Sequence, residues 1–76
     1  MSRRKSRRLK VGDRVYAVNG RVEDKKDLGT VEEITPTCAR PRGAVCGILW
    51  DDGAWDEVGP YGGPVHGILG ARPVTP

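Results

Sequence analysis

Glycine and proline interrupt this chain so often that they limit which secondary structure it can form. The sequence holds 11 Gly and 6 Pro among 76 residues. Glycine weakens the interior of a helix, and proline cannot continue one. As a result, no run of about 12 residues keeps an amphipathic helical repeat. The pattern instead predicts short strands separated by turns, and therefore an all-β domain.

The length of the chain limits what such a domain can do. A chain of 76 residues forms one small domain that buries only about 60% of the surface exposed by its unfolded form. It has room for a compact barrel but not for a deep catalytic cleft with supporting layers. The single histidine, His66, has no Ser or Cys partner in a motif of nucleophilic catalysis. We therefore expect a binding module and not an enzyme.

Metal sites, cofactors and membrane segments are not expected either. Cys38 and Cys46 do not make a disulfide framework, so we expect free thiols, with Cys46 buried. Together with His66 they lack the four closely spaced ligands of a structural zinc site. Turn and surface positions explain the acidic group Asp51, Asp52, Asp56 and Glu57. No apolar run approaches the roughly 20 residues of a membrane span, and no signal peptide is evident, which predicts a cytoplasmic protein.

Charge is distributed very unevenly along the chain. Residues 1–10 contain six basic side chains and no acidic one, whereas the remaining residues carry 7 basic and 10 acidic side chains. The six are Arg3, Arg4, Lys5, Arg7, Arg8 and Lys10. A segment so charged has nothing to bury, so we expect residues 1–8 to be a disordered basic tail and residues 9–75 to be the folded domain.

Five strands are predicted in this domain. The first follows a turn around Gly12-Asp13 and runs to Val18, and Asn19-Gly20 indicates the next turn. The other strands are expected over 28–34, 44–50 and 54–58 and near 71–74. Polar or proline-containing segments at 21–27 and 35–43, and the Gly-rich stretch 59–70, are expected to be loops.

The hairpin between the third and fourth strands has two possible registers. If Asp52-Gly53 form a two-residue turn, Trp50 and Trp55 face each other on one side of the sheet. If residues 51–53 form a three-residue turn with a bulge, the register moves by one residue. Trp50 would then lie in the core and Trp55 would point outward. The sequence leaves both registers open.

Several short motifs occur in the order typical of one group of barrels. They are Val11–Val15 (VGDRV), Gly29–Val31 (GTV), Trp50–Gly53 (WDDG), Asp56–Val58 (DEV) and Arg72–Val74 (RPV). The chain resembles small Src-homology-3-like barrels of the Tudor, KOW and agenet type, and small bacterial proteins with the same WDDG hairpin. The resemblance implies a five-stranded barrel and a role in binding nucleic acid, nucleoprotein machines or proteins. It also implies that Tyr16, Trp55 and Tyr61 meet at one end of the barrel, where they stack a base or enclose a cation.

The basic tail and these aromatic residues suggest a function. The leading hypothesis is docking onto nucleic acid or a nucleoprotein machine of transcription or translation, with the six basic residues as the anchor and Tyr16, Trp55 and Tyr61 as the source of specificity. A second hypothesis is a protein adaptor or inhibitor that binds through the acidic barrel face and the Gly-rich loop. A third is a structural subunit that self-associates through a strand edge.

Overall fold

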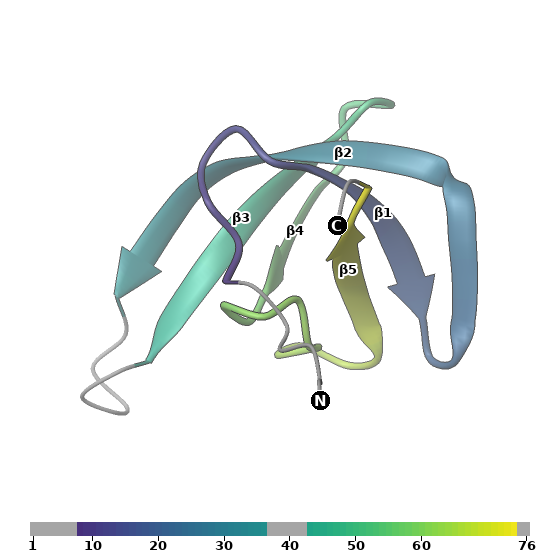
Figure 1. Cartoon of the computed structure of the whole chain (residues 1–76). Coiled ribbons are helices and arrows are strands. Elements are labelled where there is room, and N and C mark those ends of the chain that lie inside the picture. The colour runs from purple at the N-terminus through teal and green to yellow at the C-terminus, as the bar shows by residue number, and fades with distance from the viewer. Residues whose placement is uncertain (1–7, 37–42, 75–76) are drawn as a thin grey trace, which may run out of the picture.

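Five antiparallel strands form a single sheet in which the last strand returns to pair with the first (Figure 1). The computed structural model describes residues 8–36 and 43–74. The strands are β1 (Arg14–Asn19), β2 (Val22–Pro36), β3 (Ala44–Trp50), β4 (Trp55–Val58) and β5 (Leu69–Pro73), in the sheet order β4-β3-β2-β1-β5. The prediction of an all-β domain is confirmed, since these two ranges contain no helix. It follows that no described helix is long and apolar enough to cross a membrane.

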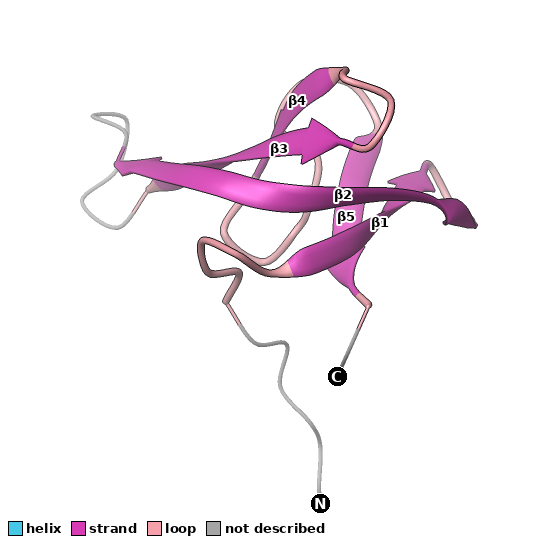
Figure 2. Cartoon of the chain, turned by 90° about the horizontal axis from the view of Figure 1, so that it is seen from above, coloured by secondary structure: helices cyan, strands magenta, loops and turns pink. Residues whose placement is uncertain are grey.

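The long strand β2 curls the sheet into a half-barrel (Figure 2). Its first part pairs with β1 and its second part with β3. Tyr16 lies opposite Leu28, but the next residue, Ala17, lies opposite Asp24, so residues 25–27 form a bulge. A second irregularity, at Glu32, lies opposite β3. Bulges bend a strand and increase its twist, which explains how one strand serves both halves of the sheet.

The prediction that residues 21–27 form a polar loop is wrong. The strand β2 already begins at Val22, which pairs with Asn19 across a two-residue turn. Gly20 in this turn has φ +69°, which suits the tight hairpin that the Asn19-Gly20 pair indicated. All of residues 21–27 are exposed, so their charged side chains stay in water, and β1 supplies pairing partners for Val22, Glu23 and Asp24. A polar sequence is compatible with such a strand because neither of its faces is buried.

A small hydrophobic core fills the concave side of the sheet. Its members are Leu9, Val15, Ala17, Val31, Cys46, Ile48, Trp50, Val58 and Ala71. Cys46 is a free and buried thiol, as predicted, and its burial raises its pKa, so the thiol stays protonated. Cys38 lies outside the described residues. Most of these core positions are small or β-branched, so Trp50 provides much of the core volume.

The β3–β4 hairpin adopts the three-residue register. The Trp50 amide donates to the Ala54 carbonyl at 2.8 Å, and the Gly53 amide donates to the Trp50 carbonyl at 2.9 Å. Gly53 has φ +94°, the left-handed conformation that a turn followed by a bulge requires. Leu49 therefore pairs with Trp55, and the two tryptophans point to opposite faces. Trp50 is 4% exposed and Trp55 is 45% exposed.

A second turn of the same design follows β4. The Gly59 amide donates to the Gly63 carbonyl at 2.7 Å, and the Gly62 amide donates to the Gly59 carbonyl at 2.9 Å. The Pro60-Tyr61-Gly62 turn thus repeats the hydrogen bonds of the Asp51-Asp52-Gly53 turn, and Val58 forms a bridge to Pro64. The Gly-rich stretch predicted to be irregular therefore begins with an ordered turn, and its last two residues belong to β5.

The Pro60-Tyr61-Gly62 turn is held on two sides. The Ala71 amide in β5 donates to the Gly62 carbonyl, and the Leu9 amide donates to the Pro60 carbonyl, both at 2.8 Å. Leu9 is itself part of the core. These contacts fix the start of the described chain, the turn and β5 against one another. The turn is therefore a firm support for Tyr61 at its tip.

Candidate functional site

The basic segment meets an exposed aromatic ring where it enters the fold. Arg8 and Lys10 are exposed, and the other four basic residues lie outside the described residues: Arg3, Arg4, Lys5 and Arg7. The Arg8 guanidinium carbon lies 5.8 Å from the centroid of the Tyr61 ring, within the range of a cation–π contact. Tyr61 is 56% exposed. The structure thus places one end of the basic segment beside an accessible aromatic residue.

Tyr16 lies on β1, on the convex face of the sheet. Its neighbours in register are Leu28 on β2 and Arg72 on β5. The Lys25 ammonium from the β2 bulge lies 5.9 Å from the centroid of the Tyr16 ring. Like Tyr61, this ring is therefore already in contact with a cation of its own chain.

Trp55 lies on β4, also on the convex face, and pairs with Leu49. Its ring covers Gly47 so closely that a Cβ atom at Gly47 would overlap the ring. The absence of a side chain at Gly47 is what allows the indole to lie flat on the backbone of β3. The indole is fixed in this way on one side and open to solvent on the other.

The structure places Tyr16 and Trp55 on strands that are not neighbours in the sheet. β1, which carries Tyr16, is separated from β4, which carries Trp55, by β2 and β3. Tyr61 belongs to the turn after β4, where Arg8 lies against it. Because the sheet curls, side chains on its convex face diverge. Tyr16 and Trp55 therefore project from strands that are not neighbours, and Tyr16 and Tyr61 each have a cation of the chain beside them.

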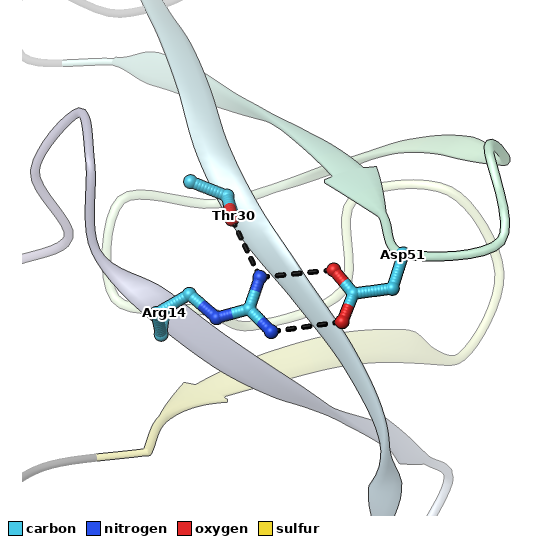
Figure 3. Close-up of polar contacts among 3 residues, drawn as sticks. All are labelled: Arg14, Thr30 and Asp51. Carbon is cyan, nitrogen blue, oxygen red and sulfur yellow. Dashed lines mark hydrogen bonds and ion pairs between the residues drawn. The ribbon is translucent and has the colours of Figure 1, made fainter.

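An ion pair that the sequence analysis missed joins three elements of the sheet (Figure 3). The Arg14 guanidinium donates to both carboxylate oxygens of Asp51, at 2.9 and 2.8 Å, and to the Thr30 hydroxyl at 2.8 Å. The contact ties the β3–β4 turn to β1 and β2. Hydrogen bonding to Arg14 lowers the pKa of Asp51. Because the two residues are 37 positions apart, no local pattern indicates this pair.

Carboxylates of the β3–β4 hairpin and of the first part of β2 gather around Asp27 in the β2 bulge, which also contains Lys25 and Lys26. Desolvation raises the pKa of Asp27, and nearby carboxylates raise it further. These carboxylates belong to Asp24, Asp52, Asp56 and Asp51. In the described part of the chain, no group of three or more His, Cys, Asp or Glu side chains has an arrangement that could hold a metal ion. His66 contacts the Glu57 carboxylate at 3.1 Å.

The Arg14–Asp51 pair should make the stability of this protein depend on pH in acid. The folded-state pKa of Asp51 is lowered, so its contribution is present above its unfolded value of about 3.9 and is lost as the pH falls through the folded value. We expect the urea midpoint of the unmodified protein to exceed that of Arg14→Gln near neutral pH, with a gap that becomes smaller as the pH falls below the unfolded pKa of about 3.9. The bond to Thr30 does not titrate and should leave a residual gap. A gap that is the same at both pH values would contradict this assignment.

Comparisons of the chain with protein-family models, with curated proteins and with solved structures found no match.

Proposed function

We propose that this chain is a non-enzymatic module, with a barrel of the Src-homology-3-like type, that docks onto nucleic acid or a nucleoprotein particle. The observation that carries the proposal is the contact between Arg8 and Tyr61. It joins the most basic segment of the sequence to an exposed ring on a firmly held turn. Five strands in one curled sheet, with β5 returning to β1, support the barrel part of the proposal.

The basic segment supplies the affinity. Lysine and arginine side chains that neutralise phosphates release condensed counterions, which makes binding strongly dependent on salt. If all six basic residues engage duplex DNA, the slope of log affinity against log salt is about −5. These contacts position the protein without reading the base sequence. Tyr61 adds a surface on which an unpaired base can stack, worth about 1–3 kcal/mol.

The charge of the barrel itself orients the complex. The described chain starts beside the loop that contains Tyr61, whereas the β3–β4 hairpin lies at the opposite end of the molecule (Figure 1). That hairpin carries Asp51 and Asp52, and other carboxylates lie near it. Phosphates are attracted more strongly to the basic segment than to this end, where the carboxylates offset Lys25 and Lys26. Nucleic acid therefore approaches at the Tyr61 end.

A salt series with the full chain tests this proposal. Binding to duplex DNA, single-stranded DNA and RNA is measured for the unmodified protein and for a variant with Arg3, Arg4, Lys5 and Arg7 all replaced by Gln. We expect a slope of about −5 for the unmodified protein on duplex DNA and about −2 for the variant, with a large loss of affinity at low salt. The same four substitutions should leave the urea midpoint unchanged, which serves as the control for folding. Absence of binding at low salt, or equal slopes, would sink the proposal.

A further inference from the structure

The half-buried ring of Tyr16 and the exposed rings of Trp55 and Tyr61 differ in what lies against them. Lys25 contacts the Tyr16 ring and Arg8 contacts the Tyr61 ring. No cation of the described residues lies over Trp55. Yet tryptophan is the best of the aromatic side chains at attracting a cation. The strongest cation acceptor on this surface is therefore the one that its own described neighbours leave open.

The geometry of Trp55 suits a binding platform. The indole lies on the backbone of β3 at Gly47, and the β3–β4 pairing holds it in place. Its neighbour in register, Leu49, is 40% exposed and extends an apolar strip along the convex face. A flat ring held from below keeps one face available to a ligand. Little conformational entropy is lost when such a prearranged ring is used.

Carboxylates flank this ring on two sides. Gly47, beneath the indole, is paired with Glu33 on β2 and with Glu57 on β4. Side chains that are directly opposite one another across neighbouring strands project from the same face of the sheet. Both glutamates are exposed, and Glu57 is also contacted by His66 at 3.1 Å. The surroundings of Trp55 are thus negative, which favours a cationic ligand and repels phosphates.

We propose that the Trp55 surface, made of Trp55, Leu49, Glu33 and Glu57, binds an arginine or lysine side chain of a basic segment in a partner protein. The charged group lies over the indole, between the two carboxylates. The aliphatic stem of the same side chain packs on Leu49. This surface is separate from the Tyr61 end that takes nucleic acid. The module would then connect a nucleic acid to a basic protein segment.

A peptide titration tests this inference on the full chain. The probe is a seven-residue peptide of alternating Arg and Gly with both ends blocked, and binding is followed by the NMR shifts of the backbone amides of Gly47 and Glu57, which lie beside the ring and are present in every variant. We expect Trp55→Ala to weaken peptide binding by about 3- to 30-fold, and Glu33→Gln to weaken it by a smaller factor. Tyr16→Ala is the matched control, because Lys25 already contacts that ring. It should bind the peptide like the unmodified protein.

The outcomes are distinct from those of the salt series. No binding at millimolar peptide, an equal loss in Tyr16→Ala, or equal binding of a peptide with Gln in place of Arg would overturn the inference. Trp55→Ala should still bind nucleic acid with unchanged affinity and salt slope. A loss of nucleic-acid affinity in Trp55→Ala would overturn the separation of the two surfaces, while leaving the nucleic-acid proposal standing.

Discussion

Gly62→Ala is expected to lower the free energy of unfolding by about 4 kcal/mol or more. Gly62 has φ +86°, which a residue with a Cβ adopts only at a cost. A Cβ at this position would also overlap the carbonyl oxygen of Ala71. That oxygen belongs to the backbone of β5 and cannot rotate away as a side chain would. The substitution must therefore displace either the Tyr61 turn or β5.

Gly53→Ala is the matched control for this prediction. Gly53 occupies the equivalent position of the other three-residue turn with φ +94°, and nothing lies within 4 Å of a Cβ built there. Its free energy of unfolding should fall by only about 1–2 kcal/mol, the cost of the left-handed backbone conformation for a residue with a Cβ. Urea unfolding followed by circular dichroism measures both variants. A domain of this length has about 4–11 kcal/mol in total, so Gly62→Ala should lose about a third of its free energy of unfolding or more. Equal losses of free energy of unfolding in the two variants would show that the overlap of the new Cβ with the Ala71 carbonyl oxygen adds no cost.

Trp50→Ala is expected to cost about 3–5 kcal/mol. Trp50 is 4% exposed and packs against Gly29, where even a Cβ would meet the indole at 2.6 Å. Its Nε1–H donates to the Asp56 carboxylate at 2.8 Å. Removal of the side chain leaves a cavity in a core with few other large side chains and leaves Asp56 without this donor. Both effects lower the free energy of unfolding.

Trp55→Ala provides the comparison within the same hairpin. Trp55 is 45% exposed and mainly covers Gly47, so its removal should cost about 1 kcal/mol or less. The two substitutions delete the same side chain from opposite faces of the sheet. Thermal unfolding of both variants gives the difference directly. Similar losses would mean that both tryptophans belong to the core. A stable Trp55→Ala protein also makes the peptide and nucleic-acid measurements interpretable.

Local patterns in the sequence were sufficient for most of the strands. The third strand was predicted with the bounds that β3 has, and the burial of Cys46 and the turn at Asp51–Gly53 were also anticipated. Alternation of side chains and turn-forming residues act over a few positions, so they are visible in one segment of sequence. The Pro60-Tyr61-Gly62 turn carries a similar pattern, and the Gly-rich composition around it concealed it.

Other features depend on contacts between distant parts of the chain. Residues 22–24 form the start of a strand because β1 provides pairing partners, which their own polarity does not predict. The choice between the two hairpin registers was decided by which tryptophan fills the core. Whether Tyr16, Trp55 and Tyr61 share a site depends on how the bulges of β2 curl the sheet. The Arg14–Asp51 pair and the Arg8–Tyr61 contact likewise exist only once the sheet has formed. The sequence alone determined the strands and turns, and the tertiary structure decided which side chains meet, because strand pairing and curvature arise from interactions between segments far apart in the chain.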